Sequence, residues 1–297
     1  MKKTLAMMTA AVMVASALAG CGSSSSTPAA TTAAATEAAT TAAATEAATT
    51  EAAGDTAAAA EGTVKTPSGK FTVGFDQEFP PMGFVGDDGQ FTGFDLDLAK
   101  EVASRLGLEF VPQPINWDAK DMELDSGNID CIWNGFTMQG REDAYTWVGP
   151  YMANNQVFVV TADSDIASKA DLAGKAVEVQ KDSSGLAALQ DEAELSASFG
   201  SMTEVADYNT ALMDLESGAC DAVCMDSIVA GYQIKSSGKD MKILDDTLSA
   251  EEYGIGFKKG EDALAKAVHD TLMDMKDDGT VAKISNDWFG SDVFTLK

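Results

Sequence analysis

Residues 71–111 decide the fold and read FTVGFDQEFPPMGFVGDDGQFTGFDLDLAKEVASRLGLEFV. The segment 71–75 is rich in apolar and aromatic residues and predicts a strand, and 108–111 predicts a second one. Between them, residues 95–105 carry apolar side chains at helical spacing, and Gly107 follows as the usual residue past a helix end. A strand, a helix and another strand in this order form the unit from which parallel sheets are built.

The alternation of strand and helix patterns continues on both sides of this unit and fills residues 63–297. Repeated units predict parallel sheets with helices on both faces, and a segment of this length favours two lobes over one. Ligands of such α/β sheets bind beyond the carboxyl ends of strands, so we expect binding residues there. The further expected strands are 129–133, 156–161, 176–180, 221–225 and 242–244, and the expected helices are 118–126, 208–217, 226–235, 261–277 and 280–288.

Residues 21–62 have the composition of a linker. After Cys21 they are almost entirely Ala, Thr, Ser, Gly and Glu, and the nonapeptide TAAATEAAT at 32–40 recurs at 41–49. These residues include no aromatic or branched aliphatic side chain that could build a core, so we expect no folded domain here.

The first residues predict export. Met1-Lys2-Lys3 is positively charged, and 5–18 is an apolar stretch of signal-peptide length, too short to span a ~30 Å hydrocarbon core. Leu18-Ala19-Gly20-Cys21 follows and resembles the bacterial lipoprotein signal. We therefore expect residues 1–20 to be a signal peptide and acylated Cys21 to anchor the protein in the lipid bilayer, on the outer or periplasmic face of the cell membrane. The alternative is an ordinary secretory peptide in which Cys21 is incidental.

The charge balance argues against nucleic acid as a partner. The chain has 20 Lys+Arg against 47 Asp+Glu, a net charge of −27, which repels nucleic acid and anionic lipid surfaces. One histidine and four cysteines without a Cys-x-x-Cys pair predict no metal site, and no cofactor is expected.

Polar and aromatic residues gather just after the expected strands, where a ligand site should lie. The first group precedes a turn that Pro80 and Pro81 hold rigid. The candidate binding residues are Asp76, Phe79, Trp117, Asn134, Gly135, Thr137, Arg141, Gln180, Ser183, Ser184 and Asp226.

A zwitterionic amino acid needs a cation for its carboxylate and an acceptor for its ammonium, and these candidates offer both. The guanidinium of Arg141 matches a carboxylate, and the free amides of a helix that begins at Ser183 and Ser184 provide a second anion-binding element. Asp226 and the Thr137 hydroxyl can accept from the ammonium, as can the Gly135 carbonyl.

The aromatic residues Phe79 and Trp117 could enclose the ligand side chain. Each residue taken alone also has a structural interpretation. Trp117 could be a core aromatic, Arg141 could form a surface ion pair, and Asp226 could be only a helix N-cap.

The order and spacing of these residues resemble the bacterial solute-binding protein family 3, the extracytoplasmic receptors of polar amino-acid ABC importers. The resemblance covers residues 65–290. The stretches that carry it are Phe79-Pro80-Pro81-Met82-Gly83-Phe84, Gly93-Phe94-Asp95-Leu96-Asp97-Leu98-Ala99, Ser126-Gly127-Asn128-Ile129-Asp130, Pro150-Tyr151, Asp171-Leu172-Ala173-Gly174-Lys175, Asp221-Ala222-Val223 and Tyr253-Gly254-Ile255-Gly256-Phe257-Lys258-Lys259-Gly260.

The resemblance implies an α/β fold of two Rossmann-like lobes joined by a two-stranded hinge, as in type II periplasmic binding proteins. Residues 63–154 and 253–297 would form lobe 1, and residues 155–252 would form lobe 2. The implied contacts are Asp76, Phe79 and Trp117 to the ligand side chain, Gly135, Thr137 and Asp226 to its ammonium, Arg141 to its carboxylate, and Ser184 as an amide contact from lobe 2.

One spacing departs from the family pattern. The family has four residues between the threonine and the arginine, whereas only Met138-Gln139-Gly140 separate Thr137 from Arg141. Gly140 can adopt backbone conformations that other residues avoid, which would let the shortened turn still direct Arg141 inward.

The resemblance predicts a monomeric protein that captures a polar amino acid and delivers it to an ABC transporter permease, without catalysis. Its lobes would close over the ligand by hinge motion. Asp76 and Glu78 favour basic or amide side chains over acidic ones. Two alternatives stay open, namely a ligand-sensing subunit that presents to a receptor, and a dehydratase-like enzyme that uses Asp76 or Glu78 as an acid.

Overall fold

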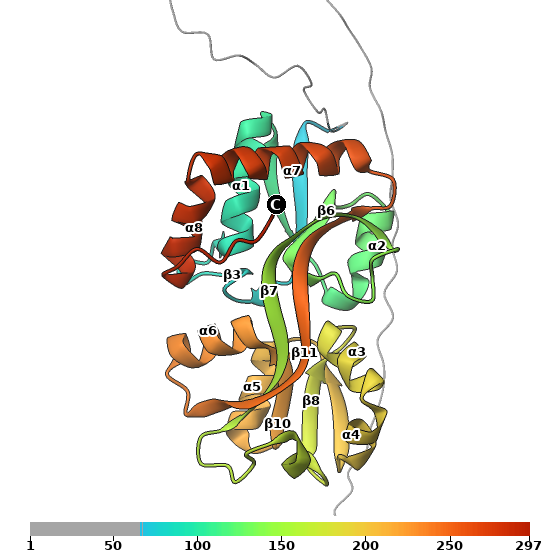
Figure 1. The fold of residues 1–297 in the computed structure, drawn as a ribbon, viewed down its shortest axis with the longest axis vertical. Coiled ribbons are helices and arrows are strands. Elements are labelled where there is room, and N and C mark those ends of the chain that lie inside the picture. Colours follow the sequence, from blue (N-terminus) through green and yellow to red (C-terminus); the bar gives the residue numbers. More distant parts are fainter. Residues whose placement is uncertain (1–65, 67) are drawn as a thin grey trace, which may run out of the picture. The chain divides into compact units, whose positions relative to one another are not determined.

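The computed structural model describes residue 66 and residues 68–297, which belong to a compact unit that spans Ala59–Lys297 (Figure 1). The expected signal peptide, Cys21 and the linker lie outside the described residues. The strands are β1 (Lys70–Phe75), β2 (Glu78–Phe79), β3 (Gly83–Val85), β4 (Phe91–Thr92), β5 (Glu109–Pro114), β6 (Cys131–Thr137), β7 (Tyr145–Thr161), β8 (Ala176–Gln180), β9 (Ser201–Val205), β10 (Ala222–Asp226) and β11 (Met241–Lys258). The helices are α1 (Phe94–Leu106), α2 (Lys120–Asp125), α3 (Ser184–Asp191), α4 (Ala193–Ser198), α5 (Tyr208–Ser217), α6 (Ser227–Ser237), α7 (Asp262–Asp277) and α8 (Thr280–Phe289), with short 3-10 turns at Trp117–Ala119 and Lys169–Leu172.

An eight-stranded sheet runs in the order β5-β1-β6-β11-β7-β10-β8-β9. β1 pairs parallel with β5 and β6, and β8 pairs parallel with β9 and β10. β7 and β11 lie antiparallel to each other and to their outer neighbours. Two parallel half-sheets are therefore joined by two antiparallel strands. Helices α1, α2, α7 and α8 surround one half, and α3 to α6 surround the other (Figure 1).

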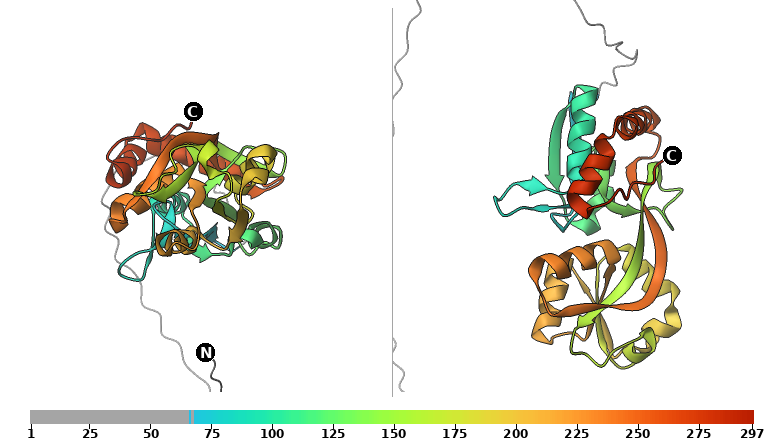
Figure 2. Two further views of the ribbon diagram at one scale, coloured as in Figure 1. Left: turned by 90° about the horizontal axis from the view of Figure 1, so that it is seen from below. Right: turned by 60° about the vertical axis from the view of Figure 1, so that its left-hand side comes forward.

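The two joining strands are much longer than the sequence patterns indicate. The expected strands 156–161 and 242–244 are the ends of β7, with 17 residues, and β11, with 18 residues. Gly149-Pro150 in β7 and Asp245-Asp246 in β11 have the composition of turns, which hides the continuous strands. Both strands cross side by side from one half of the sheet to the other (Figure 2).

Three further differences from the expected elements concern short segments. The expected helix 118–126 is a 3-10 turn followed by the short helix α2. The small antiparallel sheet of β2, β3 and β4 is absent from the expectation because strands of two or three residues show no periodicity. β9 is also absent from the expectation, because its five residues are mostly exposed and show no apolar pattern.

Helix α1, which the sequence predicts over residues 95–105, is anchored in the core by buried apolar side chains. Phe94, Leu98 and Val102 of α1 are completely buried, and each such side chain contributes roughly 1.5–3 kcal/mol of burial. Gly107 ends the helix in the left-handed conformation, with φ of 69°. The Trp288 indole on α8 donates to Asp97 at 2.9 Å, which ties the end of the chain to this helix.

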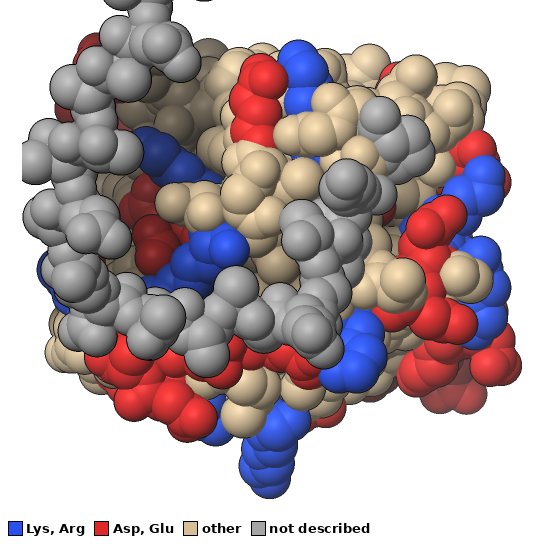
Figure 3. Space-filling model, turned by 90° about the horizontal axis from the view of Figure 1, so that it is seen from above, with Lys and Arg blue, Asp and Glu red and all other residues tan. Residues whose placement is uncertain are grey.

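The net charge is strongly negative, but positive and negative side chains are interspersed on the surface. On the face in Figure 3, lysine and arginine side chains lie among the carboxylates. None of the helices in the described part of the chain is long and apolar enough to cross a bilayer.

Candidate functional site

The fold brings nine of the predicted binding residues to the wall of one small cavity. It lies where the carboxyl ends of β6, β8 and β10 meet and contains about 230 Å³ of space not filled by atoms, part of it open to solvent. Its lining residues are Phe79, Trp117, Gly135, Thr137, Arg141, Gln180, Ser183, Ser184 and Asp226.

The other two predicted residues, Asp76 and Asn134, lie behind this wall. The Asn134 side-chain oxygen accepts from the Asp76 amide at 3.0 Å, and the Asp76 carboxylate accepts from Gln180 at 2.7 Å. Burial raises the pKa of Asp76 to about 6. Gln180 therefore stands between the Asp76 carboxylate and the cavity.

Asp226 occupies one end of the cavity as a buried hydrogen-bond acceptor. It accepts from Tyr253 at 2.7 Å, from Tyr208 at 3.0 Å and from the Asn154 amide at 2.7 Å. It is the N-cap residue of α6, yet its side chain makes no capping hydrogen bond. The carboxylate is therefore directed to the cavity instead of the helix. Its burial, and then the nearby charge of Glu251, raises the pKa of Asp226 to about 7.

The Gly135 backbone beside this end is held in a conformation that needs glycine. Its φ is 56°, and a Cβ atom there would lie 2.9 Å from the Phe79 ring. The Gly135 amide donates to the buried Asp95 carboxylate at 2.7 Å, and the Tyr151 hydroxyl donates to the same oxygen at 2.8 Å. Burial raises the pKa of Asp95 to about 7.

Arg141 and the start of α3 form another part of the cavity wall. The Arg141 guanidinium donates to the Thr137 carbonyl at 3.2 Å and lies 5.2 Å from the centre of the Phe136 ring. Gly140 adopts the left-handed conformation, with φ of 78°, in the turn that precedes Arg141. The shortened segment therefore still brings the arginine to the cavity. Among the ion pairs of the described residues, none involves Arg141.

The N-terminus of α3 belongs to the same part of the wall. The Ser183 hydroxyl caps the helix by accepting from the Leu186 amide at 3.1 Å. The Ser184 hydroxyl lies 3.1 Å from the Thr137 hydroxyl, so this contact crosses between the two halves of the sheet. A helix N-terminus and a guanidinium therefore give the cavity anion-binding groups in addition to the Asp226 carboxylate.

Two aromatic rings form the remaining walls. Phe79 is buried and packs against Tyr208 with ring centres 5.8 Å apart. Trp117 is half-buried and meets the Phe136 ring edge-on at 5.5 Å. Trp117 therefore both packs on a core cluster and lines the cavity.

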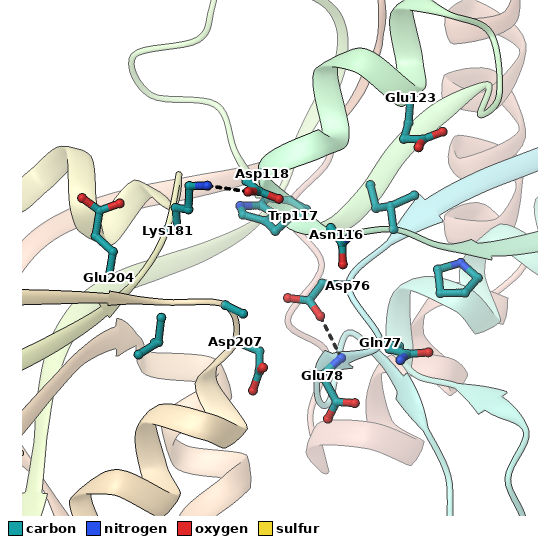
Figure 4. A pocket seen from close by; sticks show the side chains of 14 residues that line it. Asp76, Gln77, Glu78, Asn116, Trp117, Asp118, Glu123, Lys181, Glu204 and Asp207 are labelled. Carbon is teal, nitrogen blue, oxygen red and sulfur yellow. Dashed lines mark hydrogen bonds and ion pairs between the residues drawn. The ribbon is translucent and has the colours of Figure 1, made fainter. Parts of the chain in front are cut away.

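A second pocket opens on the outer side of Trp117 (Figure 4). It contains about 1560 Å³ of empty space, part of it open to solvent. The only cationic side chain in its lining is Lys181, which pairs with Asp118 at 2.6 Å. Its carboxylates are Asp76, Glu78, Asp118, Glu123, Glu204 and Asp207.

Several residues of the site are absent from the sequence-based set. Asn154 and Gln156 on β7 and Glu251 on β11 are polar side chains buried between the halves of the sheet. The sequence signal that points to such a site is the run of amide side chains at 154–156 inside an otherwise apolar strand. Lys120 is 2% exposed, lies 5.2 Å from the Trp117 ring centre and pairs with Asp182 across the two halves.

No cluster that could ligate a metal occurs in residue 66 or residues 68–297. The cavity holds no histidine, cysteine or lysine among its lining residues. Its lining instead combines a buried acceptor, Asp226, with anion-binding groups at Arg141 and the α3 N-terminus.

Comparison with known proteins identifies relatives along most of the chain. The family model for bacterial extracellular solute-binding proteins, family 3, matches residues 71–291. The L-cystine-binding protein TcyJ of Escherichia coli is 32% identical over 231 residues, covering 76% of this chain and 84% of that protein. The arginine-binding extracellular protein ArtP of Bacillus subtilis is 30% identical over 226 residues, covering 74% of this chain and 86% of that protein.

A solved structure shares the same fold. A substrate-binding protein of an ABC uptake transporter from Streptococcus pneumoniae, with bound histidine, superimposes with a TM-score of 0.74 at 34% identity. The match covers 77% of this chain and 95% of that one. The predicted α/β fold of the type II periplasmic-binding-protein class is therefore confirmed, and the chain is a binding protein, not an enzyme. It belongs to family 3 of the bacterial extracellular solute-binding proteins.

Proposed function

We propose that the small cavity holds the head group of an α-amino acid, with the ammonium at Asp226 and the carboxylate at Arg141. The chain is an amino-acid-binding protein of the ABC importer type, and this proposal assigns the two ends of its ligand. One observation supports it above all, namely that a buried acceptor and anion-binding groups line one cavity. An α-amino acid carries both an ammonium and a carboxylate on one carbon.

The ligand side chain extends past Trp117 into the acidic pocket. Six carboxylates against one lysine favour a cationic group there, so we assign a basic side chain or another one that bears an ammonium. The named ligands of the relatives, L-cystine and arginine, both carry a second positive group beyond the first. An amide side chain fits less well than these, and an acidic one is disfavoured.

The two halves close over the ligand and open by bending β7 and β11, with lobe 1 as residues 63–154 and 253–297 and lobe 2 as residues 155–252. Contacts that cross between the halves support closure, among them Gln180 with Asp76 and Lys181 with Asp118. The closed monomer then docks on a membrane permease.

Acylated Cys21 tethers the protein to the outer face of the membrane through the linker that follows it. The lipoprotein-like stretch before this cysteine supports the assignment. A Cys21→Ala variant should appear in the soluble fraction and bind its ligand unchanged. Continued membrane attachment of that variant would show that the tether is elsewhere.

A thermal-shift screen with L-cystine and the twenty common amino acids tests the ligand class. A ligand at about 1,000 times its Kd stabilises the folded state by about 4 kcal/mol, which for a domain of this size raises the Tm by roughly 8–16 °C. We expect L-arginine or L-cystine to give the largest shift. Stabilisation by L-glutamate alone would contradict the side-chain assignment, and no shift with any amino acid would contradict the function.

A further inference from the structure

Two buried carboxylates share one amide donor at the ammonium end of the cavity. Asp226 on β10 is 3% exposed and Glu251 on β11 is 5% exposed. The Asn154 side-chain nitrogen donates to Asp226 at 2.7 Å and to Glu251 at 2.6 Å. Two oxygens that share one donor nitrogen cannot be farther apart than the two bonds laid end to end, so these two carboxylates lie within about 5.3 Å.

All remaining donors to this pair are neutral. Gln156 donates to Glu251 at 2.9 Å, and the Ser184 hydroxyl lies 3.4 Å from the same oxygen. Tyr208 and Tyr253 donate to Asp226. The ion pairs found between residues 68 and 297 include neither carboxylate.

The other titratable groups around the pair keep their protons near neutral pH. Tyr208 on α5 and Tyr253 on β11 face Asp226, Cys224 precedes it by two residues on β10, and Tyr151 on β7 packs on Tyr253. Burial raises the pKa of all four groups above their usual values. The pair is therefore the place where a proton can enter or leave.

Two like charges this close in a dry site are strongly disfavoured. Burial and the Glu251 charge raise the pKa of Asp226 to about 7, so Asp226 is about half protonated near neutrality. A ligand ammonium at Asp226 supplies the missing positive charge, which favours the ionised carboxylate. The O–H bond of the carboxylic acid then breaks, its proton passes to water, and the ammonium donates to the carboxylate in its place.

We propose that Glu251 is a positioning residue of the ammonium site, whose charge keeps a proton on Asp226 when the site is empty, and that Asp226 releases this proton when an amino acid binds. This inference rests on the proposed function, because it requires an ammonium at Asp226. Glu251 lies on one of the two strands that join the halves, opposite Asn154 in the register of β7 and β11. The proposed ammonium site and its proton therefore lie directly on the two strands that join the halves.

The proposal gives binding a definite pH dependence. Below pH 7 the ligand must displace a proton, so its affinity should fall by about fivefold from pH 7 to pH 6 and by about ninefold from pH 6 to pH 5. Above pH 7 the pair is already ionised, and the affinity should become independent of pH until the ligand ammonium itself titrates.

Proton release is counted by titration calorimetry with L-arginine and L-cystine in phosphate and in a buffer of high ionisation enthalpy. We expect close to one proton at pH 6, about half at pH 7 and little at pH 8, as a group with a pKa near 7 requires. Absence of proton release from the parent protein at pH 6 would overturn the proposal without any variant.

A Glu251→Gln variant tests whether proton release depends on Glu251. The glutamine amide keeps an acceptor oxygen for Asn154 and removes the negative charge of the carboxylate. Its proton release at pH 6 should be clearly smaller than that of the parent, and its affinity should be less dependent on pH. Glu178→Gln is the matched control, since Glu178 is a buried glutamate of β8 that does not line the cavity. Asp76 and Asp95 also have raised pKa values and can contribute protons at pH 6. The role of Glu251 is therefore measured by the difference in proton release between parent and variant.

Equal release from the parent and Glu251→Gln would overturn the role of Glu251 while leaving the proposed function intact. If neither amino acid binds, the proposed function fails, and carbon-13 NMR of the ligand-free carboxyl groups tests the pair alone. The Asp226 carboxyl should titrate near neutral pH in the parent and at lower pH in Glu251→Gln. An unchanged titration would overturn the pairing.

Discussion

The small cavity and the acidic pocket on the two sides of Trp117 use charge in opposite ways. The cavity has few charged groups, and its carboxylate is buried and held by two tyrosines and an amide. The pocket has six carboxylates, and its one ion pair, Lys181 with Asp118, has side chains that are 56% and 40% exposed. In the proposed binding mode, the buried groups of the cavity bind the part that all amino acids share, and the exposed groups of the pocket bind the side chain that differs among them.

This difference predicts very unequal energies. An uncompensated charge in a buried site typically costs about 3–5 kcal/mol, whereas an exposed ion pair contributes about 0–1 kcal/mol. Substitutions in the cavity should therefore abolish binding, and those in the pocket should only tune it.

The largest effect is expected for Asp226→Ala, which would leave the ligand ammonium enclosed without a counter-ion. A loss of about 3–5 kcal/mol takes a micromolar Kd into the millimolar range. Titration calorimetry with L-arginine measures it, and Asp118→Ala is the control from the open pocket. If both variants lose the same affinity, the contrast between the two regions is wrong.

Arg141→Ala tests the anion-binding groups of the same cavity. The variant should lose a similar amount of affinity for the free amino acid and should discriminate poorly between L-arginine and its carboxamide. Calorimetry with both compounds gives the comparison. Parent-like binding of the free acid would mean that the α3 N-terminus alone holds the carboxylate.

An intermediate effect is expected at Trp117, which belongs to both regions. Trp117→Ala should weaken binding by about 1–3 kcal/mol through the lost aromatic wall and should remain folded. Trp288→Ala is the control, because Trp288 is a half-buried tryptophan on α8 that does not line the cavity. Should Trp117→Ala unfold, its role is in the core and the wall is formed by other residues.

The smallest effect is expected for Lys181→Met, which removes the exposed pair with Asp118. The affinity for L-arginine should change by less than about fivefold, and the change should shrink in high salt because the groups are exposed. Binding measured at low and at high salt decides this. A loss as large as that of Asp226→Ala would show that the pair is desolvated when ligand is bound.

The sequence predicts which residues the fold gathers at one cavity better than it predicts the strands that carry them. The candidates Gln180 and Asp226 each end or directly follow a short apolar strand, and the ends of parallel strands meet at one edge. The helix face of Phe94, Leu98 and Val102 is equally local in origin. Such features depend on spacing within a single element, which the sequence displays.

The Glu251–Asn154 pair could not be found in this way. Its residues are nearly a hundred positions apart and meet only through the antiparallel register of β7 and β11. Neither strand shows the alternation of a half-buried strand, since each passes from one half of the sheet to the other and changes its environment on the way. Register between distant strands depends on tertiary packing, which single-sequence patterns do not contain.

The placement of α7 and α8 on α1 has a consequence for the order in which the chain acquires its structure. Arg105 on α1 pairs with Asp278 at 2.6 Å, and the Trp288 indole donates to Asp97. As a ribosome supplies the chain from its first residue, α1 waits for partners that emerge about 170 residues later. The parallel strands β1, β5 and β6 emerge before β8 to β10, but the helices that pack on α1 emerge after the parallel strands of both half-sheets. The half-sheet that begins the folded chain is thus the last to be finished.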